Sequence, residues 1–230
     1  MTIADNVKCV LDRAGEAAIR SGRTPGDIAV LAASKMNSAD RVREAISAGI
    51  RILGENRQQE LTEKNAQGAY DGTALHFIGH LQKNKLNKLV GVCDMIQSVD
   101  SFEIMEAISQ RAMKLDTVQD VLVEINIGRE ENKSGVLPEC ADELLAKSSD
   151  LKGICIKGLM SIPPKSENNA RNYNYFDELC KIYVDMSAKK YDNINMCVLS
   201  MGMSADFESA ILAGATMVRI GSGIFGQRHY

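Results

Sequence analysis

The chain has 230 residues, of which 45% are hydrophobic and 25% are charged, and its formal net charge at pH 7 is −3. The hydrophobic fraction excludes a disordered chain and is sufficient for a large core. The slightly acidic balance offers no basic face of the kind that nucleic-acid binding requires. The length suits either one α/β barrel or two small domains.

Residues 1–22, MTIADNVKCVLDRAGEAAIRSG, show an amphipathic pattern with charges throughout, which predicts a helix rather than a signal peptide. No apolar run approaches the roughly 20 residues that are needed to span a bilayer. Six cysteines occur without a C-x-x-C pair, which favours free thiols over disulfides or a metal site. We therefore expect a cytoplasmic protein that binds no metal, membrane or nucleic acid.

Eight short apolar or β-branched runs follow, and helical patterns lie between them. The predicted strands are 28–33, 51–53, 75–78, 95–97, 121–126, 156–160, 196–200 and 217–220. The predicted helices between them are 39–48, 57–64, 82–90, 101–114, 139–147, 169–189 and 205–213. Strict alternation implies parallel strands, because each return needs a crossover helix. The sequence thus predicts a single-domain (β/α)₈ barrel over residues 1–230, with an extra N-terminal helix.

An open Rossmann-like sheet is the alternative fold, but no G-x-G-x-x-G motif follows the first predicted strand. In a barrel, the active face is formed by the C-terminal ends of the strands and the loops after them. Lys35 lies there, separated from the apolar run 28–33 only by Ser34. Partial burial disfavours its ammonium form and leaves an amine that can attack a carbonyl. The alternative is a lysine that merely extends to solvent at a strand end.

The segments after the last two strands are rich in glycine and serine, and phosphate sites in these barrels often lie there. Residues 200–204, Ser-Met-Gly-Met-Ser, precede a predicted helix whose free N–H groups favour an anion. Ser204 is also a candidate N-cap for that helix. Gly221-Ser222-Gly223 provides a second permissive turn. A reactive lysine opposite a phosphate site suggests a phosphorylated aldehyde, and pyridoxal 5′-phosphate (PLP) is the commonest such cofactor.

Arg219 precedes the second glycine turn by two residues. If it faces inward, it is placed to donate a hydrogen bond to the pyridine nitrogen of PLP, which would keep that nitrogen unprotonated. The alternative is an ion pair with a carboxylate of the barrel such as Glu124. Among the other candidates, we expect His80 to contact the pocket and His76 to be structural. Lys133, in the polar loop 129–135, is either part of a lid or simply exposed.

Seven stretches are together highly specific, although each alone is not. They are VLAASK (30–35), GENRQQE (54–60), LHFIGHLQKNK (75–85), QSVDS (97–101), VEINIGREENKSG (123–135), KGLMSI (157–162) and LSMGMSADFESAILAGATMVRIGSGIFGQR (199–228). On these stretches the chain resembles the pyridoxal phosphate homeostasis protein family, whose fold is that of the N-terminal barrel of alanine racemase. The resemblance extends over nearly the whole chain.

The resemblance implies that Lys35 holds PLP as a Schiff base and that Asn56 lies close to the cofactor ring. It implies that Arg219 faces the pyridine nitrogen. The phosphate would be held by Ser204, Gly221 and Ser222, with Ser200 nearby. The chain has Ser222 where the family often has threonine, which preserves the hydroxyl, and Ala32-Ala33 where a valine is usual before the serine and lysine.

The resemblance favours a carrier or regulator of PLP without ordinary amino-acid turnover, which passes the cofactor to apo-enzymes and is monomeric. The alternative is a racemase-like PLP enzyme, which needs a second acid/base opposite the lysine. Alanine racemase takes that group, a tyrosine, from a C-terminal β-domain for which this chain shows no sequence. None of the six tyrosines falls at the end of a predicted strand. An enzyme that binds a sugar-phosphate aldehyde on Lys35 is a third possibility.

Overall fold

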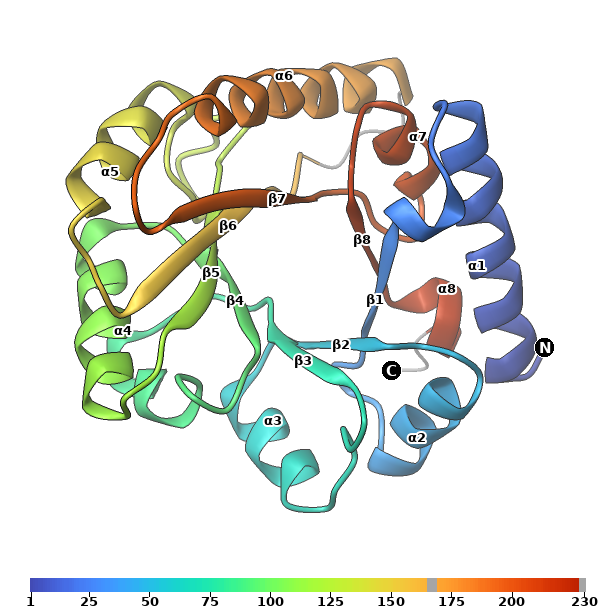
Figure 1. The fold of residues 1–230 in the computed structure, drawn as a ribbon. Helices are drawn as coiled ribbons and strands as arrows, with labels where there is room; N and C mark the ends of the chain where they lie inside the picture. The colour runs from blue at the N-terminus through green and yellow to red at the C-terminus, as the bar shows by residue number, and fades with distance from the viewer. Residues whose placement is uncertain (165–168, 228–230) are drawn as a thin grey trace.

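The computed structural model describes residues 1–164 and 169–227, and within them eight parallel strands close into a barrel in the order of the chain. Figure 1 shows the barrel, with the helices arranged around its outside. The strands are β1 (Ala29–Ala33), β2 (Ile52–Glu55), β3 (Ala74–Phe77), β4 (Met95–Val99), β5 (Gln119–Glu124), β6 (Ile154–Met160), β7 (Ile194–Ser200) and β8 (Met217–Ile220). The predicted (β/α)₈ fold class is confirmed.

The α-helices are α1 (Ile3–Arg20), α2 (Ala39–Ser47), α3 (Gln58–Asn65), α4 (Phe102–Lys114), α5 (Ala141–Ser148), α6 (Asn169–Ser187), α7 (Phe207–Leu212) and α8 (Ser222–Phe225). Three 3₁₀ helices in the described residues are η1 (Pro25–Asp27), η2 (Lys83–Lys88) and η3 (Pro138–Cys140). None of the described helices combines the length and the apolar character that a bilayer crossing requires.

The predicted N-terminal helix is α1, and its start is fixed by a capping box. The Thr2 hydroxyl accepts from the Asp5 backbone N–H at 3.1 Å, while the Asp5 carboxylate accepts from the Thr2 backbone N–H at 3.0 Å. This reciprocal arrangement satisfies N–H groups that a helix start otherwise leaves unpaired. The apolar face of α1 packs against α7 and α8, next to the junction of β1 and β8 (Figure 1).

Three predicted elements differ from the structure. Residues 82–90 form only the 3₁₀ helix η2, although Leu86, Leu89 and Val90 are buried at a spacing that also suits an α-helix. The helix predicted at 205–213 begins at Phe207, since Asp206 closes a turn back to the Met203 N–H and carbonyl. The turn predicted at Gly221–Gly223 opens the short helix α8.

The barrel follows the two-residue period of its strands. On β1, Leu31 packs with Met217 of β8 inside the barrel, whereas Val30 and Ala32 belong to the outer core under the helices. Phe176 of α6 and Phe207 of α7 are fully buried in that outer core. Because the interior is filled with side chains, a ligand site can form only at the open end, where the strands finish.

Candidate functional site

The strand period points several predicted residues into the barrel mouth. Lys35 continues the inward positions of β1, and Arg219 and Gly221 continue those of β8 from Met217. Pairing of β1 with β8 places Leu31 beside Arg219. Asn56 likewise follows the inward residues of β2, since Ile52 packs in the interior cluster. These residues therefore converge although they are distant in sequence.

A cavity of about 480 Å³ lies where they converge. It is lined by Ala33, Lys35, Asn56, Ile78, Ile162, Met203, Ser204, Ala205, Arg219, Gly221, Ser222 and Gln227. Thus the cavity brings together every predicted site residue except Ser200. A cavity of this volume is ordinary for a small-molecule site.

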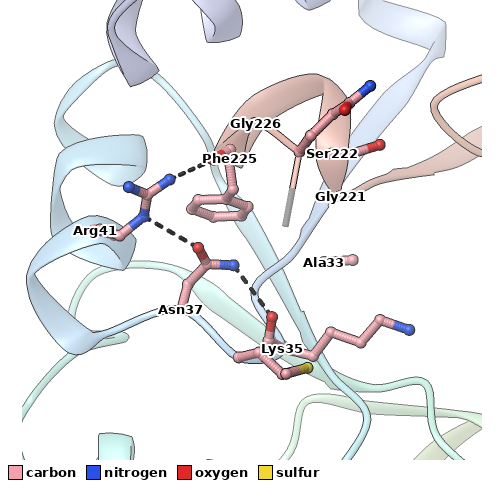
Figure 2. Close-up of a pocket in the computed structure, with 10 residues that line it drawn as sticks. Ala33, Lys35, Asn37, Arg41, Gly221, Ser222, Phe225 and Gly226 are labelled. Atoms are coloured by element: carbon pink, nitrogen blue, oxygen red, sulfur yellow. Dashed lines mark hydrogen bonds between the residues drawn. The ribbon is translucent and has the colours of Figure 1, made fainter. Parts of the chain in front are cut away.

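An adjoining cavity of about 310 Å³ shares Lys35, Gly221 and Ser222 with the first. Figure 2 shows this second cavity. The Lys35 side chain extends away from Asn37 and Arg41, which tie the segment after β1 to α8. Asn37 donates to the Lys35 carbonyl at 3.1 Å, and Arg41 donates to the Phe225 carbonyl and, at 3.1 Å, to the Asn37 side-chain oxygen.

Ser204 joins the turns that follow β7 and β8. Its hydroxyl oxygen accepts from the backbone N–H of Gly221 at 3.3 Å and from that of Gly223 at 3.1 Å. The prediction that Ser204 caps the helix after β7 is wrong, because the N-cap of α7 is Asp206. The two glycine-containing turns are instead held together, so that backbone N–H groups and hydroxyls gather at one end of the cavity.

Arg219 is buried, and its guanidinium donates to the Ser200 carbonyl at 2.8 Å, the Ser200 hydroxyl at 2.7 Å and the Ser161 carbonyl at 2.8 Å. Burial lowers the pKa of Arg219 to about 10, so the side chain remains cationic at neutral pH. Among the described residues, Arg219 forms no ion pair with Glu124, which was the alternative partner. Burial and the nearby Asp100 carboxylate raise the pKa of Glu124 to about 7, and Arg219 acts in the opposite direction.

The prediction that Ser200 lies near the phosphate stays a prediction, and the structure places this residue outside the cavity lining. Ser200 pairs in register with Met217, two residues before Arg219 on β8, and is therefore one layer deeper in the barrel. Its hydroxyl donates to the Gln97 side-chain oxygen at 2.7 Å and accepts from Arg219. Ser200 is fully buried and does not line the cavity, so its role is to support Arg219 from below.

A chain of polar contacts continues from Ser200 across the barrel. The Gln97 amide nitrogen lies 2.8 Å from Nδ1 of His76, which is buried on β3. Burial lowers the pKa of His76 to about 4, and the ring is therefore neutral near pH 7. A neutral Nδ1 accepts from the Gln97 amide, whose oxygen then faces Ser200. The structural role predicted for His76 is confirmed.

Asn56 presents a buried side-chain oxygen with no hydrogen-bond partner among the described residues, and the same side chain lines the cavity. Buried polar atoms are rarely left unpaired. A ligand in the cavity can satisfy this atom, and the arrangement therefore fits a molecule that carries a hydrogen-bond donor near Asn56.

His80 does not reach the cavity. It is exposed, and its Nδ1 lies 2.9 Å from the Ser134 hydroxyl. The expectation that His80 contacts the pocket is therefore wrong, because its ring is bonded to Ser134 of the 129–135 loop at the surface. Lys133 forms an ion pair with Glu130 within its own loop. That loop is fastened to the end of β5, where Glu130 and Asn126 exchange two hydrogen bonds.

Sequence reasoning missed two groups of residues around the site. Ile162 and Met203 supply apolar surface at the cavity and are partly exposed. Behind Lys35, a buried polar cluster contains Ser34, Glu55, Lys64 and Tyr70. A charged residue directly after an apolar strand, as in Gly54-Glu55-Asn56, was the available signal for this cluster.

Comparison with known proteins assigns the class of the barrel. The family model of the alanine racemase N-terminal domain matches residues 18–229. The pyridoxal phosphate homeostasis protein of Aquifex aeolicus is 40% identical to this chain, and the match covers 100% of both chains. The pyridoxal phosphate homeostasis protein of Pseudomonas aeruginosa is 37% identical, and the match covers 100% of this chain and 97% of the relative. The chain thus belongs to the alanine racemase N-terminal family of barrels. Within it, the chain belongs to the pyridoxal phosphate homeostasis proteins.

A solved relative carries the cofactor. The structure of PipY from Synechococcus elongatus, described as having PLP bound, matches with a TM-score of 0.83 and 30% identity, over 98% of this chain and 100% of that chain. The resemblance to the homeostasis family noted from the sequence motifs is thereby confirmed.

We predict that buried His76 weakens the fold as the pH falls. Its pKa of about 4 in the folded state lies below the value of about 6.5 in an unfolded chain, so the unfolded state binds more protons between these values. The free energy of unfolding should drop by on the order of 1–2 kcal/mol more in wild type than in His76→Asn between pH 7 and pH 5. Urea denaturation at the two pH values measures this difference.

His80→Asn is the matched control for this measurement, because the ring of His80 is exposed. An equal loss of stability in wild type and His76→Asn would show that His76 is not held neutral in the fold.

Proposed function

We propose that this protein binds PLP through a Schiff base on Lys35 and acts in PLP homeostasis as a carrier or regulator. The observation that supports this most is that one cavity contains a strand-end lysine, a buried cation and the joined Ser204 and Gly221–Gly223 turns. The curated relatives are named pyridoxal phosphate homeostasis proteins, and PipY has been solved with PLP.

In this proposal the neutral Lys35 amine attacks the aldehyde carbon of PLP, a carbon–nitrogen double bond forms, and the aldehyde oxygen leaves as water. The phosphate lies against the N–H groups and hydroxyls of Ser204, Gly221 and Ser222, which favour an anion. Arg219 faces the pyridine nitrogen. Since its guanidinium is held by Ser161 and Ser200 and remains charged, it donates a hydrogen bond there.

The same geometry favours a carrier over an enzyme. PLP supplies an electron sink when its ring nitrogen is protonated, and the cationic donor Arg219 opposes that protonation. Two-base racemisation also needs a second acid/base, which is often a tyrosine. None of the five tyrosines in the described residues lines the cavity, and Tyr230 lies outside the described residues. We further propose that the protein is a cytoplasmic monomer that passes PLP to apo-enzymes.

We predict that Lys35 is the covalent attachment point. Borohydride reduction of the PLP-loaded protein followed by peptide mass mapping should place a pyridoxyl group on Lys35, because this lysine alone among the lysines of the described residues lines the cavity. Lys133→Ala, at a loop lysine paired with Glu130, is the control and should label like wild type. Labelling of wild type only at another lysine would contradict the assignment.

We predict that the phosphate contributes much of the affinity. Charge-assisted hydrogen bonds contribute on the order of 1.5–3 kcal/mol each. The double variant Ser204→Ala and Ser222→Ala should therefore bind PLP at least about tenfold more weakly, as measured by calorimetric titration. Pyridoxal, which lacks the phosphate, should bind wild type poorly. The control is Ser149→Ala, whose exposed hydroxyl bonds only to the Ala146 carbonyl. Equal affinity for PLP and pyridoxal would rule out a phosphate site.

We predict that the loaded protein does not turn over amino acids at a useful rate, since the cavity offers no tyrosine from the described chain opposite Lys35. Exchange of the α-hydrogen of L-alanine and L-serine in D₂O should stay well below roughly 1 s⁻¹, the low end of ordinary enzyme turnover. Proton NMR follows this exchange directly. Lys35-dependent exchange at that rate or above would make the protein a racemase-like enzyme.

A further inference from the structure

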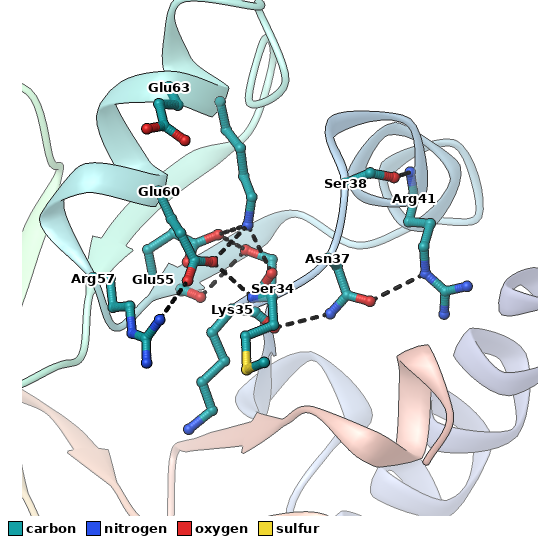
Figure 3. A network of polar contacts seen from close by, with 12 residues as sticks. Ser34, Lys35, Asn37, Ser38, Arg41, Glu55, Arg57, Glu60 and Glu63 are labelled. Atoms are coloured by element: carbon teal, nitrogen blue, oxygen red, sulfur yellow. Dashed lines mark hydrogen bonds and ion pairs between the residues drawn. The ribbon is translucent and has the colours of Figure 1, made fainter. Parts of the chain in front are cut away.

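The backbone on both sides of Lys35 is held by side chains of α3 (Figure 3). The Lys64 ammonium donates to the Ser34 carbonyl at 2.9 Å, and the Glu60 carboxylate accepts from the Met36 backbone N–H at 2.7 Å. Both residues therefore form hydrogen bonds to the peptide units on either side of Lys35. Neither contact involves the Lys35 amine, which points away from them towards the cavity.

Glu60 and Lys64 are one helical turn apart and form an ion pair at 3.4 Å, with side-chain exposures of 19% and 8%. At such low exposure, charge-assisted hydrogen bonds are stronger than they are in open solvent. Because the two residues are bonded to each other as well as to residues 34 and 36, α3 holds this segment as one unit, which we call the Glu60–Lys64 clamp.

Glu55 holds the clamp in place. One oxygen of this fully buried carboxylate accepts from the Lys64 ammonium at 2.6 Å, the Ser34 hydroxyl at 2.6 Å and the Tyr70 hydroxyl at 3.0 Å. Burial raises the pKa of Tyr70 well above its usual value, so its hydroxyl stays protonated as a donor. Lys64 is therefore fixed in place by two carboxylates.

The clamp holds Met36 in an uncommon backbone conformation. Its φ of 62° lies in the left-handed region, which is uncommon for a residue with a side chain and costs on the order of 1 kcal/mol. The exposed Met36 side chain gives little packing to offset this cost, as 57% of its surface is accessible. Two hydrogen bonds hold this conformation: the Met36 N–H donates to Glu60 at 2.7 Å, and the Asn37 N–H closes the turn on the Ser34 carbonyl at 3.1 Å. The bond to Glu60 is the one that ties the turn to α3.

We propose that the Glu60–Lys64 clamp is the positioning device of the site: it fixes the Lys35 backbone so that the amine meets the aldehyde of PLP. This inference rests on the proposed function. A lysine has a long, flexible side chain, and the rate and extent of bond formation depend on how far its possible positions are restricted. Glu60 and Lys64 act through Lys35 and touch no ligand themselves.

Glu60→Ala is the test variant, because it removes the acceptor for the Met36 N–H but leaves Lys64 paired with Glu55. Glu63→Ala is the matched control: Glu63 is exposed on the same helix, bonds to Gln59 and points away from the cluster (Figure 3). Glu60→Gln keeps an acceptor oxygen of similar reach and is the conservative variant. Lys64→Met alone would leave the buried Glu55 carboxylate without its cationic partner, so this substitution is made together with Glu55→Gln.

The readout compares the affinity for PLP with the affinity for pyridoxamine 5′-phosphate, which has the ring and phosphate but no aldehyde. By calorimetry, Glu60→Ala should lose at least about tenfold in affinity for PLP, with pyridoxamine phosphate affinity unchanged. Glu60→Gln should recover most of the loss, the Glu55→Gln and Lys64→Met double variant should behave like Glu60→Ala, and Glu63→Ala should match wild type. Urea denaturation of each ligand-free variant confirms that it is folded.

Two results would contradict the positioning role proposed for the clamp. If Glu60→Ala binds PLP like wild type, the clamp does not position Lys35. If it loses affinity for PLP and pyridoxamine phosphate equally, Glu60 only shapes the cavity. Failure of the proposed function is recognised separately, in wild type: absence of a borohydride-reducible bond on Lys35 would reject the function and the clamp together.

Discussion

Pairing between β1 and β8 is the interaction on which the site depends. These strands lie near opposite ends of the chain, and four residue pairs join them, from Ala29 with Met217 to Ala32 with Ile220. Because the pairing is parallel and in register, the segments that follow the two strands emerge side by side. Lys35 and the Gly221–Gly223 turn are therefore neighbours, and α1 covers this junction from outside by packing on α7 and α8.

Two polar systems, on opposite sides of the strand wall, support Arg219 and Lys35 of the cavity. Inside the barrel, His76, Gln97 and Ser200 form a neutral chain that ends on Arg219. Outside it, Glu55 is directed towards α3, where Lys64 meets it. The alternation of a strand explains this division, since neighbouring residues face opposite sides. Asn56 thus enters the cavity while Glu55 supports the wall behind it.

Position at or just beyond the end of an apolar strand made Lys35, Arg219 and Gly221 predictable, because the C-terminal ends of barrel strands form the active face. The position of Ser200 below the cavity could not be predicted, since spacing gives the side of the strand but not the depth in the barrel. Ser204 was misread because a hydroxyl before a helix suits either a cap or a contact with a distant turn. Lys64 could not be predicted, as a lysine on a polar helix is normally exposed and its burial depends on Glu55, Glu60 and the Ser34 carbonyl, which the fold brings to it.

Burial of these charged and polar groups has a definite consequence for binding. The free energy needed to desolvate Glu55, Lys64 and Arg219 is spent when the chain folds, not when a ligand arrives. Their hydrogen bonds then hold the wall behind Lys35 and the guanidinium of Arg219 without ligand, which lowers the ordering cost that a ligand would otherwise meet. Among the described residues, the cavity presents a ligand with the unpaired Asn56 side-chain oxygen and with Lys35, Ser204, Arg219, Gly221 and Ser222. The side chains around the cavity are therefore held in place by the fold itself, before any ligand arrives.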